Sequence, residues 1–468
     1  MTDPSSPIES LAPRRAFAVL APLFGLLYVL ATPPFQSPDE PQHFYRAYQI
    51  SELGFIVRKS ADTPEPGAGG VLPRSLKVVA DLVMADVPHN IRRYVDPEAV
   101  KAALRIPLQP DDREFLEFST DVLYSPVPYA PQAAAIGLGR LFHAPPLVLL
   151  YLARVFNLAA WLLLVAAALR LTPVFRWVFL VLALAPMSIA QAASASADAL
   201  TNGAAFLLIA AVFEAVFAPG AVLDRARLLR LAALTLAVAL SKPVYALLPF
   251  LVLLVPAARY EAPKKLRVAA AAIPFLGGAA AAAWSAAVSS LSVPLRSGVS
   301  SSGQIHFILA HPGRFLSAIR AMVAAHFGDH VHEFVGQLGW LDVALPAALI
   351  LLFLVVLALA ALADKNEKIE VRWPPRALGL IITAVSAAAI VTAIYIVWNP
   401  VGAAGIEGVQ GRYFIPFGPL ILLLFYNRKI PPLLDRIRIL RGVLISFSAW
   451  TLLFGLAALL SRFYNVIR

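Results

Sequence analysis

Eleven apolar segments separated by polar ones constrain this chain more than any other feature. They lie at about 16–32, 147–169, 174–191, 200–218, 229–241, 244–257, 266–288, 341–363, 377–398, 414–426 and 442–460. Most of these segments are long enough to cross the hydrocarbon core of a bilayer as helices. The two short ones, 229–241 and 244–257, are expected to form a hairpin broken at Ser241-Lys242-Pro243. With 59 % hydrophobic residues among 468, the sequence predicts an all-α polytopic membrane protein, a bundle of about 11 transmembrane helices.

The positions of the basic residues predict how this bundle is oriented. The segments expected inside hold 20 Lys and Arg residues, and they are 1–15, 170–176, 219–230, 259–267, 364–376 and 427–441. The short segments expected outside hold 7, and they are residue 242, 289–340, 399–413 and 461–468. Because cytoplasmic loops carry the excess of basic residues, we expect the N-terminus inside and the long polar segment 33–126 outside. The odd number of crossings leaves Arg462 and Arg468 outside. The net charge of +11 then reflects topology, and no nucleic-acid partner is expected.

Three parts follow from this pattern: a disordered cytoplasmic N-terminus (1–15), a transmembrane domain (16–460) and a C-terminal tail (461–468). The domain includes two extracytoplasmic loops, 33–126 and 289–340, of which the first is expected to carry interfacial helices. The run at 127–142 is short for a span, which favours a re-entrant or interfacial helix. The tract Gly67-Ala-Gly-Gly70 is expected to be a mobile turn. The chain has no cysteine, which excludes disulfides and thiolate chemistry.

One polar stretch directly follows the first apolar segment and holds two adjacent acids, Asp39 and Glu40. On a helix, Asp39, His43 and Arg46 have i, i+4, i+7 spacing and share a face. This spacing predicts an amphipathic helix that lies on the membrane with its polar groups toward water.

The same residues fit a second interpretation, in which they only begin a helix. Ser37 is then the N-cap, Pro38 the first helical residue and Glu40 the third, as in a capping box. Acids in a first turn complement the helix dipole and need no catalytic role.

Further polar residues lie on the same predicted outer side. Asp198 follows Gln191 in the turn before the fourth apolar segment, and either begins a capped helix or takes part in a site. Lys242 either snorkels beside Pro243 or faces the site. Arg412 and Tyr413 follow Gln410-Gly411, where a guanidinium suits a phosphate or anchors the chain at headgroup level.

The loop 289–340 contains a histidine pair, His326 and His330, with Asp329 and Glu333 nearby, but no His-Glu-x-x-His motif. We therefore expect solvated histidines and assign no metal ligands. The chain also lacks a Lys-Ser/Thr nucleotide loop and a Gly-x-Ser-x-Gly elbow, so a nucleotide-driven pump or a serine hydrolase is unsupported. Two separated acids with several cations suit group transfer from a lipid-phosphate carrier, because a carboxylate removes the acceptor proton and cations stabilise the departing phosphate.

Three stretches resemble the bacterial membrane family known as domain of unknown function 2142. They are Ser37-Pro-Asp-Glu-Pro-Gln-His-Phe-Tyr-Arg-Ala-Tyr-Gln-Ile-Ser51, Tyr124-Ser-Pro-Val-Pro-Tyr129 and Gln410-Gly-Arg-Tyr-Phe-Ile-Pro416. The likeness spans roughly residues 16–460. That family in turn resembles the GT-C glycosyltransferases, among them the protein mannosyltransferases and aminoarabinose transferases. By this likeness Asp39 matches the first acid of the group and Asp198 the second.

The resemblance implies a GT-C-like enzyme of the bacterial inner membrane with its active site on the extracytoplasmic side. It would transfer a sugar, with inversion, from a polyprenyl-phosphate donor to an envelope acceptor such as a glycan, lipid or protein. The expected catalytic residues are Asp39, Glu40 and Asp198, and the expected donor-phosphate ligands are His43, Arg46, Lys242, Arg412 and Tyr413. No cofactor is expected, and a divalent metal stays open.

The alternative is a transporter or flippase of lipid-linked glycans. Transporters usually place ionisable groups near the bilayer midplane and often contain internal repeats. The candidate residues here gather at the predicted outer interface and no repeat is evident, which favours the enzyme.

Overall fold

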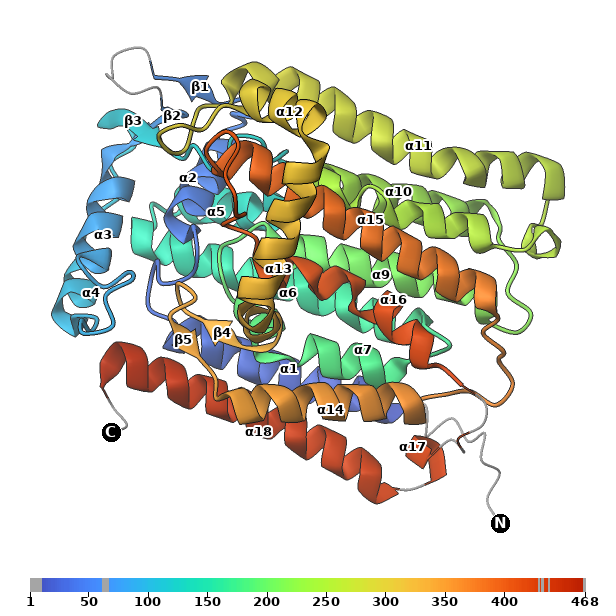
Figure 1. Ribbon diagram of the computed structural model, residues 1–468. Helices are drawn as coiled ribbons and strands as arrows, with labels where there is room; N and C mark the ends of the chain where they lie inside the picture. Colours follow the sequence, from blue (N-terminus) through green and yellow to red (C-terminus); the bar gives the residue numbers. More distant parts are fainter. Residues whose placement is uncertain (1–10, 61–66, 428–429, 431–432, 437, 466–468) are drawn as a thin grey trace.

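Long helices running side by side make up most of the structure, a computed structural model that describes residues 11–60, 67–427, 430, 433–436 and 438–465 (Figure 1). The long helices that run side by side are α1 (Ala12–Ala31), α6 (Pro146–Leu171), α9 (Asp198–Phe217), α10 (Arg225–Ser241), α11 (Pro263–Val288), α14 (Ala347–Ala363), α15 (Trp373–Trp398) and α18 (Arg438–Tyr464). By length and hydropathy, six described helices qualify as membrane spans, namely α1, α6, α9, α11, α15 and α18. The chain is thus a helical membrane protein, as its apolar segments predict.

The other apolar segments form shorter or broken helices, and proline explains several of the breaks. Segment 174–191 divides into α7 (Arg176–Ala183) and α8 (Pro186–Ala192), since Pro186 cannot donate a helical hydrogen bond. Segment 244–257 is broken into η3 (Pro243–Tyr245) and η4 (Leu248–Leu254). Segment 414–426 is broken into η7 (Gly411–Phe417), α16 (Gly418–Leu422) and η8 (Leu423–Phe425). The expected break at residues 241–243 is confirmed, because α10 ends at Ser241 and Lys242 is extended, with φ −145°. Eleven crossings stay a prediction.

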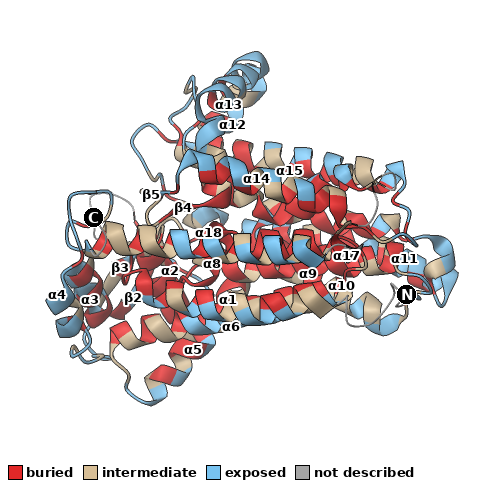
Figure 2. Cartoon of the chain, turned by 90° about the horizontal axis from the view of Figure 1, so that it is seen from below, coloured by how far each residue is buried: buried red, intermediate tan, exposed pale blue. Residues whose placement is uncertain are grey.

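Helix α9 is the centre of the bundle. Of the residues in its apolar window, 83 % are buried, against 33 % in α11, α15 and α18, so the latter helices present more of their apolar surface outward. Figure 2 shows the same contrast between buried interior and exposed periphery. α9 packs against α6 along much of its length, and the absence of a side chain at Gly203 permits this close approach, since a Cβ there would lie 3.0 Å from Leu164.

The segment 33–126 is folded onto one end of the bundle. Its elements are α2 (Glu40–Ser51), β1 (Arg58–Lys59), β2 (Ala68–Pro73), α3 (Arg74–Met84), α4 (Pro97–Ala103) and β3 (Arg113–Glu117), followed by η2 (Val127–Tyr129) and α5 (Ala130–Leu141). The three strands form an antiparallel sheet in the order β1-β2-β3. The expected mobile turn at Gly67–Gly70 is wrong, because Gly69 and Gly70 lie in the central strand. A Cβ at Gly69 would lie 2.0 Å from the Leu116 carbonyl oxygen, so glycine permits the close strand pairing.

Helix α2 is buried. The spacing predicted an amphipathic helix with its polar face in water, and this prediction is wrong. His43, Phe44, Arg46 and Tyr48 are all buried, and the helix contacts α5 and β2. The prediction fails because the polar side chains of α2 find partners inside the protein, so neither face needs water. The amphipathic spacing alone could not reveal these partners.

The remaining elements connect the last helices. They are η5 (Ala257–Arg259), η6 (Ser289–Leu291), α12 (Ser301–Ala310), α13 (Pro312–Val335), β4 (Gln337–Leu338), β5 (Val343–Ala344) and α17 (Leu433–Arg436). In Figure 1, α13 runs steeply across the direction of α11 and α15, and in Figure 2 α12 and α13 project from the side of the bundle. The pair α12–α13 is called the arm below.

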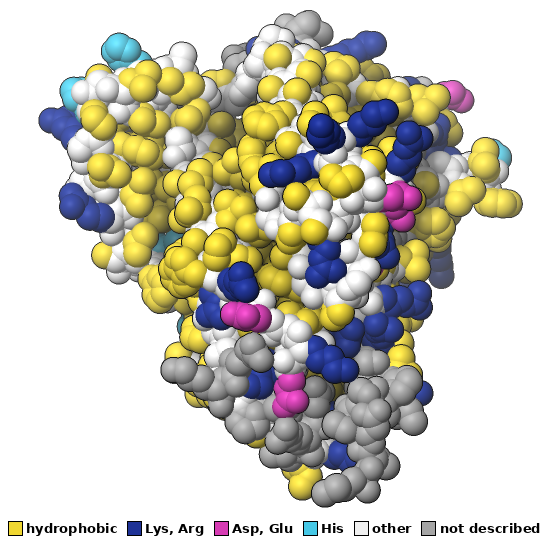
Figure 3. Space-filling model, turned by 90° about the vertical axis from the view of Figure 1, so that its right-hand side faces the viewer, with side chains coloured by type: hydrophobic (Ala, Val, Ile, Leu, Met, Phe, Trp, Pro, Cys, Tyr) yellow, Lys and Arg dark blue, Asp and Glu magenta, His cyan; other side chains and the backbone are white. Residues whose placement is uncertain are grey.

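One end of the bundle is rich in basic side chains. Figure 3 views the end that lies to the right in Figure 1, where Lys and Arg side chains are spread over the surface and acids are few. This basic end agrees with the orientation predicted from the Lys and Arg positions. The opposite end, which carries α2 to α5, is called the site end below. Which end faces the cytoplasm stays a prediction.

The chain ends differ slightly from the sequence boundaries. α1 begins at Ala12, so Arg14 lies inside it and donates to the carbonyl oxygens of Leu169 and Arg170 at 3.2 and 2.9 Å. Residues 1–10 of the expected disordered lead lie outside the described residues. At the other terminus α18 continues to Tyr464, and Arg462 pairs with Asp342 at 2.8 Å, which explains a basic residue at the site end. Arg468 lies outside the described residues.

Candidate functional site

The adjacent acids Asp39 and Glu40 have opposite surroundings. Asp39 precedes the first residue of α2 and has a left-handed backbone, with φ 59°, a conformation that aspartate tolerates better than most residues. Its carboxylate makes no capping bond, and among the described residues it has no hydrogen-bond or ion-pair partner. The capping-box interpretation with Ser37 as N-cap is therefore wrong. Asp39 is half-buried and free.

Glu40 is fully buried in an ion pair with Arg154 of α6. The Arg154 guanidinium donates to both carboxylate oxygens, at 2.8 and 2.5 Å, and neither side chain is exposed. Arg154 also donates to the carbonyl oxygens of Val29, Thr32 and Pro33 at 3.1, 2.7 and 2.9 Å. Arg154 thus ties the end of α1 and the start of α2 to α6, and both carboxylate oxygens of Glu40 are in use.

The same carboxylate also holds the loop before α9. Glu40 Oε1 accepts the backbone N–H of Ala195 at 2.9 Å. Asn157, one turn after Arg154 on α6, donates to the carbonyl oxygens of Ser194 and Ser196 at 2.8 and 2.9 Å. These bonds place the start of α9, and with it Asp198, beside the start of α2.

Asp198 lies between two cations that come from distant parts of the chain. One of its oxygens pairs with the ammonium of Lys242, and the other accepts from Arg412 Nη1 at 3.3 Å and from Gln191 Nε2 at 2.9 Å. All three charged side chains are at most 10 % exposed. One carboxylate between two cations leaves one unit of positive charge, so the three side chains together attract an anion.

Aromatic rings surround the cations. The ammonium of Lys242 lies 5.6 Å from the ring centroid of Tyr124 and 5.0 Å from that of Tyr413, within the range of cation–π attraction. The Tyr245 hydroxyl donates to the Tyr413 carbonyl oxygen at 2.9 Å. The phenol rings thus limit how far the ammonium can move.

The arm supports the loop that carries Arg412. Glu333 of α13 accepts the backbone N–H of Gly411 at 2.6 Å, and His330 Nε2 donates to the Val409 carbonyl oxygen at 3.1 Å. Burial raises the pKa of Glu333. A Cβ at Gly411 would lie 1.8 Å from the carbonyl oxygen of His330, so only glycine permits this contact.

His43 forms a second buried group close to Asp39. Its Nδ1 lies 2.6 Å from a carboxylate oxygen of Asp121 and 2.8 Å from the Tyr129 hydroxyl. Burial lowers the pKa of His43, but the Asp121 carboxylate outweighs this effect and the pKa is raised overall. The charge of Asp39 acts in the same direction on His43, which places the free carboxylate near the imidazole.

Arg46 is separate from this cluster. Its guanidinium donates to Gln49 Oε1 at 2.5 Å and to the carbonyl oxygens of Phe55 and Tyr124 at 2.7 and 3.4 Å. These bonds fold the chain after α2 back onto the helix. Arg46 therefore has buried partners of its own.

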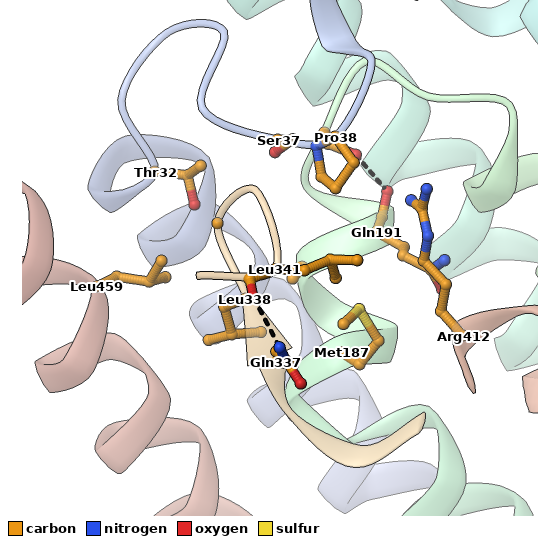
Figure 4. A pocket seen from close by; sticks show the side chains of 13 residues that line it. Thr32, Ser37, Pro38, Met187, Gln191, Gln337, Leu338, Leu341, Arg412 and Leu459 are labelled. Carbon is orange, nitrogen blue, oxygen red and sulfur yellow. Dashed lines mark hydrogen bonds between the residues drawn. The ribbon is translucent and has the colours of Figure 1, made fainter. Parts of the chain in front are cut away.

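A narrow cavity reaches the cluster from the side. Figure 4 shows Arg412 and Gln191 on one wall and Thr32 and Leu459 on the other, with the Ser37-Pro38 segment beside them. Its volume of about 20 Å³ holds little more than a water molecule. A larger ligand therefore enters only after side chains move. No group of three or more His, Asp or Glu residues in the described part of the chain is placed to hold a metal ion.

A family model described as a predicted membrane protein, DUF2142, matches residues 22–421. The chain belongs to this family. The match includes every candidate residue from Asp39 to Tyr413. In this DUF2142 protein six of them form one cluster, namely Asp39, His43, Asp198, Lys242, Arg412 and Tyr413. Comparison with curated proteins and with solved structures gave no match.

Two functional candidates of this DUF2142 chain escaped the sequence analysis. Arg154 carried one signal, since an ionisable residue inside an apolar segment needs a buried partner. Asp121 carried none, because nothing in its neighbourhood along the chain distinguishes it from the other acids of the 33–126 segment. Both are recognisable only from the residues that they contact.

Proposed function

We propose that this DUF2142 protein is a glycosyltransferase that moves a sugar from a polyprenyl-phosphate-linked donor to an envelope acceptor on the extracytoplasmic face. One observation carries the proposal: the carboxylate of Asp39 has no partner among the described residues and is close enough to Arg412 for its charge to act on it, and Arg412 shares a single acid with Lys242. The resemblance to GT-C glycosyltransferases supplies the reaction class.

The two cations are suited to the donor phosphate. Arg412 offers a planar pair of N–H groups and Lys242 a compact charge, and both are held in place by Asp198. As the bond between the anomeric carbon and the phosphate oxygen breaks, its electron pair leaves with the polyprenyl phosphate. The two cations then stabilise the growing negative charge in a site largely shielded from water.

Asp39 takes the acceptor proton. The acceptor oxygen forms a bond to the anomeric carbon, and its hydrogen passes to the free carboxylate of Asp39. Asp198 cannot serve equally well as the base because its oxygens already engage Lys242, Arg412 and Gln191. We assign Asp198 to holding the cations and Glu40 to holding the start of α2. Arg46 likewise has a structural role, because it holds the chain that follows α2.

The test uses purified protein in proteoliposomes with a labelled polyprenyl-phosphate sugar supplied at the site end. Asp39→Asn removes the charge and changes little else, so we expect the transfer rate to fall by about 10²–10⁴-fold, the usual cost of losing a general base. Asp86→Asn is the matched control, because Asp86 lies in the same segment and is exposed. If Asp39→Asn keeps more than about a tenth of the rate, far above that range, Asp39 is not the base.

The same proteoliposomes test the transporter alternative. A flippase moves the labelled donor across the bilayer without releasing polyprenyl phosphate. Donor movement without sugar transfer would refute the glycosyltransferase proposal in favour of the flippase.

A further inference from the structure

The arm α12–α13 has an apolar stripe that no part of the described chain covers. Leu316 and Phe327 of α13 are 58 % and 65 % exposed, and Leu309 of α12 is 76 % exposed. On α13, Leu316, Val323 and Phe327 are spaced i, i+7, i+11, so they follow one line along the helix. The opposite side of α13, with Ala318 and Met322, packs on the bundle.

The arm is oriented across the candidate spans. Figure 1 shows α13 running steeply across α11 and α15, and Figure 2 shows the arm projecting sideways from them. It contacts the last turns of α15, where the ring of Phe315 stacks on that of Tyr395 at 5.3 Å. If α15 crosses the bilayer, the arm lies in the plane of the membrane, near the end of the span.

The charges of the arm fit a lipid interface. Arg320 lies beside the apolar stripe and Arg314 farther round the exposed surface of α13. The acids do not oppose them: Asp329 pairs with His326 at 3.0 Å, and Glu333 is buried against Gly411. A helix with exposed Leu and Phe on one line and an arginine next to it is typical of helices that lie at headgroup level.

We infer that the arm is an in-plane membrane anchor whose apolar stripe enters the lipid of the leaflet at the site end, with Arg320 at the lipid phosphates. Because the same helix holds the loop at Val409 and Gly411, the anchor fixes the depth of Arg412 relative to the lipid headgroups. The inference concerns lipid contact alone and stands whether or not the protein transfers sugars.

The experiment measures depth directly by spin labelling. The chain has no cysteine, so single variants Leu316→Cys and Phe327→Cys carry one label each without any background change. The matched controls are Ser317→Cys and Ala325→Cys, exposed positions of α13 that lie off the apolar stripe. The full chain is reconstituted in vesicles of phosphatidylethanolamine and phosphatidylglycerol, and collisions with oxygen and with a water-soluble nickel chelate are compared.

We expect oxygen collisions to exceed nickel collisions at 316 and 327, and the reverse at 317 and 325. Nickel collisions exceeding oxygen collisions at 316 and 327 would place the stripe in water and overturn the inference. Low collision rates with both reagents would mean that a protein surface covers the stripe, which overturns it equally. None of these outcomes depends on sugar transfer, so the proposed function can fail independently.

Discussion

Glu40→Gln should damage the fold far more than the same change at a partly exposed ion pair of the site end. Glu40 and Arg154 are both unexposed, and the Glu40 carboxylate accepts two bonds from Arg154 and one from Ala195. Glutamine keeps the shape but turns one acceptor oxygen into an NH₂ group facing the guanidinium. Arg154 is then a buried charge without a counter-charge, which should lower the free energy of unfolding by about 3–5 kcal/mol.

The assay is thermal unfolding of the purified protein in detergent, followed by loss of the monomer peak in size-exclusion chromatography. Glu52→Gln is the matched control. Glu52 also pairs with two arginines, Arg113 at 2.6 Å and Arg140 at 3.2 Å, but these pairs are partly exposed and should contribute about 1 kcal/mol or less. We expect the midpoint temperature to fall much further for Glu40→Gln. Equal midpoints for the two variants would refute the reasoning that Glu40 is a buried structural anchor.

Two further predictions concern the phosphate ligand and the orientation. Arg412→Lys keeps the charge but loses the planar fork, so the KM for the donor should rise more than the KM for the acceptor; an unchanged donor KM in Arg412→Ala would remove Arg412 from donor binding. Glu98→Cys, on an exposed side chain of the 33–126 segment, should react with an impermeant thiol reagent in intact spheroplasts. Reaction only after lysis would reverse the predicted orientation and place the site on the cytoplasmic side.

The tertiary structure decided which candidate acid is free. Asp39 and Glu40 are adjacent, of the same type and equally suited to a helix start, so no local property separates them. Arg154, 114 positions away, engages Glu40 and leaves Asp39 without a partner. In the same way the Gly67–Gly70 tract was indistinguishable from a turn until β3 paired with it, and α2 was predicted at the surface because its buried partners come from other parts of the chain.

The sequence by itself determined the membrane class, the apolar segments and the break at Lys242. Each of these depends on residues that are neighbours along the chain: a run of apolar side chains must leave water wherever it folds, and Pro243 lacks a helical hydrogen-bond donor in any surroundings. It also singled out Asp198, Lys242 and Arg412, because charged residues beside apolar segments are costly. Only the tertiary structure brought these three together across more than two hundred positions, since the contact between two helices depends on the packing of every helix around them.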